Sequence, residues 1–143
     1  MTYVLPATAT EWIAEYRSRL NESDAFASAA AGWGVDFDGS FRFDVLPDDN
    51  YDGPTLSFFI DVVDGNCVRA SYLDAPREQS AAFRFYGPAT QWKRLLTGDL
   101  DPVEGRREEM FELDGDIQKV LQYATAIQLL TETAAEIDTA FDY

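Results

Sequence analysis

The chain has 143 residues, 46% of them hydrophobic and 14% aromatic, which excludes a disordered, collagen-like or disulfide-stabilised protein and predicts one domain over residues 1–143. With 26 Asp and Glu against 11 Lys and Arg, its formal charge of −15 disfavours nucleic acids and anionic bilayers as partners. The chain has no histidine and one cysteine, Cys67, which excludes imidazole catalysis, histidine metal sites and an intramolecular disulfide.

Two helices are predicted near the N-terminus. Thr8 and Glu11 match a capping box, so the first helix is expected over residues 8–21. Its apolar residues recur at helical spacing and form one stripe: Trp12, Ile13, Tyr16 and Leu20. A second, shorter helix is expected from Ser23 to Ala31, where Gly32 ends it.

Four strands follow, each predicted from alternating apolar and polar residues. The dipeptide Asp64-Gly65 separates two of them and is typical of a tight hairpin turn. We expect these strands to form an antiparallel meander with their aromatic side chains on one face. The four segments are residues 35–45, 56–63, 66–73 and 81–86.

The last third of the chain is predicted to be helical, with one strand inside it. A helix is expected from Pro88 to Gly98, and a short one after Asp101-Pro102. Residues 110–114 are predicted to form the last strand, and Asp116 to cap a long helix that begins at Ile117. Strands followed by segregated helices predict an α+β fold with the helices on one face of the sheet.

Most local motifs have a structural explanation. Asp48–Gly53 matches the first half of a calcium loop, but Phe59 stands where the bidentate Glu is needed, so we predict a turn with a weak cation site as the alternative. Paired carboxylates such as Glu108-Glu109 or Asp114 with Asp116 are expected by chance in so acidic a chain. Dinucleotide, phosphate-loop and nucleophile-elbow motifs are missing, and we expect Cys67 to be a small buried side chain. We predict no catalytic residue, no metal and no cofactor.

The acidic residues are spread along the chain, and its two lysines are Lys93 and Lys119. This composition resembles cytosolic proteins of halophiles, in which salt screens the repulsion between carboxylates. The alternative is a surface for a cationic partner. We find no apolar run of the roughly 18–20 residues that a membrane span needs, and no signal-peptide pattern, so the sequence predicts a cytoplasmic protein without stable membrane insertion.

Three stretches in a particular order resemble the sterol carrier protein 2 (SCP-2) family. Residues 33–45 resemble its first strand, and residues 92–102 resemble its helix and L-x-G-x-x-x-P turn. Residues 111–116, followed by the long helix, resemble its final strand and Gly-Asp turn. The likeness covers a core of about residues 30–132, and together with the composition it suggests a stand-alone domain from a halophilic archaeon.

The resemblance implies a five-stranded, mostly antiparallel sheet covered by helices, with an apolar tunnel between the sheet and the C-terminal helices. It also implies non-enzymatic binding or carriage of a fatty acid, fatty acyl-CoA, isoprenoid or sterol-like lipid. The positions that it implies for the tunnel wall are Phe58, Ile60, Phe83, Phe85, Trp92, Leu96, Phe111, Leu121, Ala124 and Leu129.

The sequence departs from the family in two places. Glu109 stands where many members have glycine, and the tail Phe141–Tyr143 lacks a peroxisomal ending. Arg69 and Arg84 are candidates to meet an acyl head group, but solvated sheet-face arginines paired to carboxylates are the favoured interpretation of both.

Periodicity does not distinguish a filled core from a cavity lined by the same residues. Two alternatives to the carrier therefore stay open, an interaction module with a filled core and a small enzyme that acts on an apolar substrate. A cavity would argue against the first of these alternatives. A carboxyl with a raised pKa inside the pocket would argue for the second.

Overall fold

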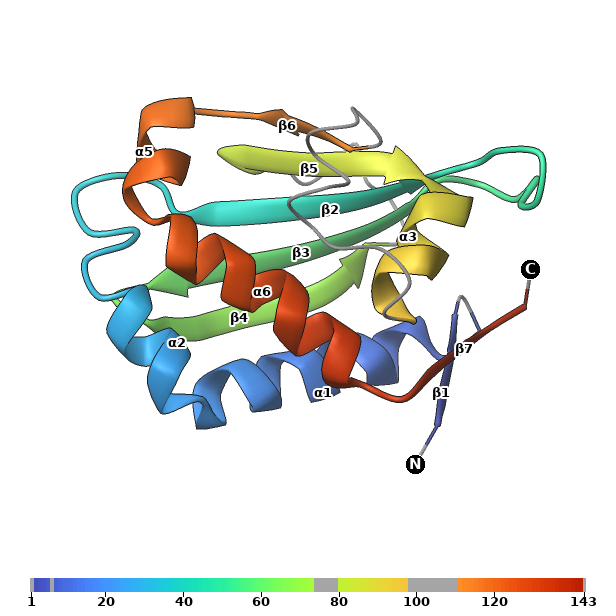
Figure 1. Cartoon of the computed structure of the whole chain (residues 1–143), viewed down its shortest axis with the longest axis horizontal. Helices are drawn as coiled ribbons and strands as arrows, with labels where there is room; N and C mark the ends of the chain where they lie inside the picture. The colour runs from blue at the N-terminus through green and yellow to red at the C-terminus, as the bar shows by residue number, and fades with distance from the viewer. Residues whose placement is uncertain (1, 6, 74–79, 98–110, 143) are drawn as a thin grey trace.

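The computed structural model describes residues 2–5, 7–73, 80–97 and 111–142 (Figure 1). The fold is α+β, as expected, and α6 lies in front of the sheet in the view of Figure 1. In chain order, the elements are β1 (Tyr3–Leu5), α1 (Ala9–Glu22), α2 (Asp24–Ala29), β2 (Ser40–Leu46), β3 (Leu56–Val63), β4 (Asn66–Leu73), β5 (Phe83–Pro88), α3 (Ala89–Leu96), β6 (Glu112–Asp114), α5 (Ile117–Gln122), α6 (Ala124–Glu136) and β7 (Thr139–Phe141).

The main sheet has five strands in the order β4-β3-β2-β5-β6. Strand β3 pairs antiparallel with β2 and β4, and β5 pairs antiparallel with β6, which confirms the mostly antiparallel sheet. The four-strand meander is wrong at its last step, because β5 pairs with β2 and runs parallel to it. This position sets Phe83 beside Phe41 and Phe85 beside Phe43, so the aromatic face continues across the centre of the sheet.

The first strand of the sheet begins at Ser40 rather than at Val35. Gly34 and Asp36 both have positive φ angles, +77° and +67°, which extended backbone does not allow. A Cβ at Gly34 would lie 2.3 Å from the carbonyl oxygen of Val62, so the chain needs glycine there. Residues 34–39 instead turn near the buried Trp33, whose indole N–H donates to the carbonyl of Gly39 at 3.0 Å.

The N-terminal helices occupy the predicted segments, but the capping box does not form. The hydroxyl of Thr8 accepts a hydrogen bond from the backbone N–H of Val4 at 2.7 Å and donates one to its carbonyl at 3.0 Å. It therefore makes no cap bond to α1. Helix α2 is capped by Ser23, which accepts from the N–H of Phe26, and it ends at Ala29, two residues before the predicted end.

The hairpin between β3 and β4 forms as predicted, with Asp64 and Gly65 both at positive φ. Asp116 caps α5 as predicted, accepting from two backbone N–H groups of the first turn. The long C-terminal helix is interrupted at Tyr123, which separates α5 from α6. Predictions on Gly98, Asp101-Pro102, Glu108, Glu109 and Met110 lie outside the described residues.

A second, two-stranded sheet was not predicted. Its strands, β1 and β7, come from opposite ends of the chain and run parallel, with Tyr3 beside Thr139. The indole N–H of Trp12 donates to the Thr139 hydroxyl at 3.0 Å, which connects this small sheet to α1. Three-residue strands are too short to show a recognisable alternation.

The loop that resembles half a calcium site is a turn stabilised by Asp48. One carboxylate oxygen accepts from the N–H groups of Asn50 and Tyr51, and the other accepts from the N–H of Thr90 at 2.7 Å. Thr90 lies in the first turn of α3, so Asp48 caps a helix that is distant in sequence. Burial acts to raise the pKa of the Asp48 carboxyl, but these hydrogen bonds together hold it below 3.8.

We predict that Asp48→Ala lowers the free energy of unfolding by about 1 kcal/mol, because the substitution removes the helix cap and both turn hydrogen bonds. The contribution is fully present above the ordinary carboxyl pKa of 3.8 and is lost as the pH falls through the lower pKa of the folded state. Urea unfolding at several pH values measures both effects. Asp52→Ala, in the same loop but exposed, is the control, and an equal loss in both variants would contradict the cap.

Candidate functional site

An apolar cavity of about 410 Å³ lies between the sheet and the α5–α6 segment. Strands β2, β5 and β6 form its floor, and α5 and α6 form its roof. The polar side chains among the described lining residues are Gln128 and Thr131. The lining consists of Phe41, Phe43, Phe85, Leu113, Ile117, Val120, Leu121, Ala124, Ile127, Gln128, Leu130 and Thr131.

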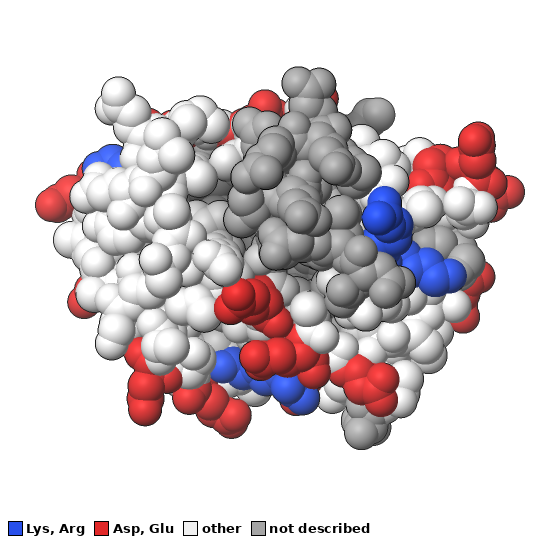
Figure 2. All heavy atoms as spheres, in the orientation of Figure 1, with Lys and Arg blue, Asp and Glu red and all other residues white. Residues whose placement is uncertain are grey.

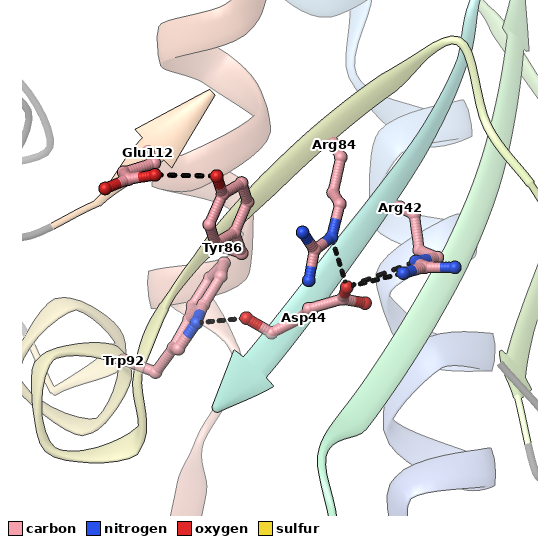
Figure 3. Close-up of polar contacts among 6 residues, drawn as sticks. All are labelled: Arg42, Asp44, Arg84, Tyr86, Trp92 and Glu112. Atoms are coloured by element: carbon pink, nitrogen blue, oxygen red, sulfur yellow. Dashed lines mark hydrogen bonds and ion pairs between the residues drawn. The ribbon is translucent and has the colours of Figure 1, made fainter. Parts of the chain in front are cut away.

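Aromatic side chains pack beside the floor of this cavity. Phe85 stacks on Phe111 with ring centroids 5.0 Å apart, and Trp92 meets Phe111 edge to face at 5.1 Å. The indole N–H of Trp92 donates to the backbone carbonyl of Asp44 at 2.9 Å (Figure 3). Because its polar atom is satisfied by β2, the Trp92 ring can lie among apolar neighbours at no hydrogen-bonding cost.

A much smaller void of about 40 Å³ adjoins the cavity. The two share Phe43, Leu130 and Thr131 as lining residues, so they lie side by side. The phenol of Tyr16 lines the small void and donates to the carbonyl of Leu130 at 2.8 Å, which joins α1 to α6. Burial, with a smaller contribution from Cys67, raises the pKa of Tyr16 well above its ordinary value, so this donor keeps its proton.

The ten proposed wall residues fall into three groups. Phe85, Leu121 and Ala124 line the cavity. Phe58, Trp92 and Leu96 line the small void. The remaining four belong to the core or pack against it, and neither void has them in its lining: Ile60, Phe83, Phe111 and Leu129.

The cavity also has lining residues that the sequence-based wall does not include. Phe41 and Phe43 alternate on the same strand, and that alternation was sufficient to find them. On the roof, Ile117 and Val120 lie at helical spacing from the proposed wall residues Leu121 and Ala124, and this signal was available in the sequence as well.

Comparison with known proteins agrees with this architecture. The model of the SCP-2 sterol transfer family matches residues 19–128. This chain belongs to the SCP-2 sterol transfer family. The comparison with curated proteins found no match.

Solved structures support the SCP-2 assignment. A crystal structure of sterol carrier protein 2 is 30% identical, with a TM-score of 0.78 over 90% of this chain and 96% of that chain. A conserved hypothetical protein of Thermus thermophilus is also 30% identical, with a TM-score of 0.75 over 91% of this chain and 88% of that chain. Sterol carrier protein 2 of Aedes aegypti in complex with palmitate is 14% identical, with a TM-score of 0.51 over 86% of this chain and 93% of that chain, and shows likeness of fold alone.

The arginines considered for a head-group role lie on the other face of the sheet in this SCP-2 domain. Asp44 is fully buried, and its Oδ2 accepts from Arg42 at 2.9 Å and from Arg84 at 2.5 Å (Figure 3). Arg84 alternates with the cavity residue Phe85 and is therefore directed away from the cavity. Arg69 lies over the ring of Phe59 at 5.2 Å. The pairing favoured from the sequence is observed for Arg84, whereas Arg69 contacts an aromatic ring.

Within residues 2–5, 7–73, 80–97 and 111–142, no group of three His, Cys, Asp or Glu side chains is placed to hold a metal ion. Asp114 and Asp116 are both exposed, so neither carboxylate lies in an apolar pocket. In the described part of the chain, we find no helix with the length and apolar character to cross a bilayer.

Cys67 is buried in β4, as expected, beneath α1. Its backbone N–H donates to the side-chain oxygen of Asn21 at 2.8 Å, and its carbonyl accepts from Asn21 and Arg17. Burial raises the pKa of the Cys67 thiol from 9.0 to about 11, although Arg17 acts in the opposite direction. A protonated, buried thiol is a poor nucleophile.

We predict that Cys67 reacts with a disulfide reagent such as dithionitrobenzoate about tenfold more slowly in the folded protein than an unperturbed thiol does, because a pKa of about 11 lowers the thiolate fraction about 100-fold and the greater nucleophilicity of that thiolate offsets about half of the effect on a logarithmic scale. Burial adds to this protection. The folded-state contribution of the neutral thiol is present below pH 9.0 and is lost as the pH rises toward 11. Absorbance of the released thiolate measures the rate, with the urea-unfolded chain as the control. Equal rates in the folded and unfolded protein would contradict the burial.

Proposed function

We propose that this SCP-2 domain binds an apolar ligand in the cavity between the sheet and α5–α6 and carries it without chemical change. Candidate ligands are a fatty acid, a fatty acyl-CoA, an isoprenoid or a sterol-like lipid. The observation that carries the proposal is the cavity of about 410 Å³ with a mostly apolar lining. Its volume is within the range of about 300–1,000 Å³ that is usual for small-molecule sites.

The energetics favour a carrier rather than a store. Burying ten methylenes from water stabilises a complex by about 8 kcal/mol, at roughly 0.8 kcal/mol for each methylene. Against a bilayer the same term nearly cancels, because lipid is as apolar as the cavity. The protein would therefore accept and release its ligand near a membrane, while keeping it out of water between membranes.

The alternatives have less support. An interaction module with a filled core needs no cavity, and the cavity counts against it. A small enzyme needs reactive groups, and the described lining residues contain no ionisable side chain. The palmitate complex of the Aedes aegypti protein is an example of an apolar chain in a protein of this fold.

The experiment that tests the proposal is native mass spectrometry of the purified protein, with organic extraction of the same sample. A one-to-one adduct that is extracted as a lipid would support binding and identify the ligand class. An unmodified mass after incubation with palmitic acid, palmitoyl-CoA and cholesterol would overturn the proposal.

We predict that Ala124→Trp weakens binding of a fluorescent fatty acid by about tenfold or more, because the indole ring would occupy space at the edge of the cavity. Fluorescence titration measures the affinity. The matched control is Val68→Trp, which adds an indole at an exposed apolar residue outside both voids. Circular dichroism confirms that both variants fold, and equal affinities would contradict this place for the ligand.

We further propose that the protein functions in concentrated salt, as proteins of a halophilic archaeon do. The formal charge of −15 supports this, because carboxylate repulsion is screened over about 10 Å at 0.1 M salt and about 3 Å at 1 M.

We predict that the free energy of unfolding rises between these two concentrations of KCl, as measured by thermal or urea unfolding. Choline chloride at the same ionic strength should have the same effect. A fall in stability with either salt would contradict the proposal.

A further inference from the structure

The surface around the open side of the cavity carries almost no charge. It consists of residues 25–35, which include α2 after its first residue, Asp24, and residues 117–131, which include α5 and most of α6. Lys119 is the one charged residue in these two stretches, although the whole chain has a formal charge of −15. We call this surface the neutral face, and it appears as the uncharged area at the left of Figure 2.

Apolar side chains are exposed on the neutral face where the cavity meets solvent. Leu121 is 70% exposed and Ile117 is 45% exposed, although both also line the cavity. They lie four residues apart on α5 and therefore on one side of that helix. Val35, on the same face, is also 45% exposed. The cavity is thus open beside a group of unburied apolar side chains.

The neutral face is anchored to the core beneath it. The ring of Tyr123, between α5 and α6, meets the buried Trp33 edge to face at 5.2 Å. The ammonium of Lys119 lies 4.7 Å from the centre of the Phe37 ring. A groove between α2 and the α5–α6 junction is lined by uncharged side chains, among them Ser28, Gln122 and Thr125. The face is therefore a fixed surface of the domain.

We propose that the neutral face docks on the surface of a lipid bilayer, so that the ligand passes between bilayer and cavity without crossing water. The inference rests on the proposed function and adds the place of exchange. An acidic surface is repelled by anionic lipids, whereas the neutral face has no carboxylate and one ammonium. Leu121 and Ile117 are placed to enter the boundary between head groups and acyl chains, as apolar side chains of interfacial helices do.

The test is the transfer of pyrenedecanoic acid from the loaded protein to vesicles. One set is phosphatidylcholine, and the other is phosphatidylcholine with an equal amount of phosphatidylglycerol. Docking requires the transfer rate to rise with vesicle concentration. Release into water gives a rate that is independent of vesicle concentration, and that result would overturn the proposal.

Charge variants on the neutral face locate the contact. Ser28 is exposed and is not part of the cavity lining, so its variants should keep the equilibrium affinity for the probe. Ser28→Asp should slow transfer to the anionic vesicles, and Ser28→Lys should accelerate it. Leu121→Asp should slow transfer to both kinds of vesicle by about tenfold. Val68→Asp, the matched control outside the face, should transfer at the unmodified rate, and equal rates in all variants would overturn the proposal.

Two further measurements separate the other outcomes. Analytical sedimentation tests whether a second copy of the chain covers the neutral face instead. A dimer that Leu121→Asp abolishes would identify that second copy and overturn bilayer docking. Titration without vesicles tests the proposed function by itself. Normal probe binding with transfer that is independent of vesicles refutes the docking alone, whereas no binding refutes the function on which it rests.

Discussion

The buried carboxylate of Asp44 is the interaction on which the rest of the structure depends. An unpaired carboxylate at this depth would be very unfavourable, and Arg42 from the same strand and Arg84 from β5 neutralise it. The ion pair between Arg84 and Asp44 connects β5 to β2 in their parallel register. That register places Phe85 beside Phe43, and the backbone carbonyl of Asp44 receives the indole N–H of Trp92. One residue thus contacts both central strands of the cavity floor and the helix beside them.

The alternation of side chains on β2 and β5 gives the sheet one apolar face and one charged face. The charged residues of these strands lie on the face away from α6 together with Tyr86, and the phenylalanines lie toward α6. An apolar ligand would therefore meet rings and aliphatic groups, while ion pairs remain on the opposite face of the sheet. An acidic chain repels other copies of itself through its carboxylates, and the described lining of the cavity contains none of these carboxylates.

Local sequence patterns predicted many of the helices, strands and turns. Most of the features that they did not predict depend on pairing between residues distant in sequence. The helix from Ala9, the hairpin at Asp64-Gly65 and the cap at Asp116 each depend on a few adjacent residues. The partner of β5 depends on a contact about forty residues away, which alternation does not encode. The interruption at Tyr123 has no proline or glycine to mark it, and the Tyr123 ring there packs edge to face on Trp33, which is distant in sequence. The proposed wall was likewise incomplete, because buried aromatic residues have the same sequence pattern whether they fill a core or line a cavity.

The parallel pair β1–β7 has a consequence for the order of folding. Thr2 donates to the carboxylate of Asp138 across a sequence separation of 136 residues, so this contact closes nearly the whole described chain into a loop. The entropy lost in closing a loop grows with its length. Two three-residue strands form few hydrogen bonds to offset that loss. We expect the pair to form after the five-stranded sheet has brought α1 and α6 together, and to separate first on heating. The pairing of the two ends of the chain would then lower the rate at which α6 detaches from an already folded sheet.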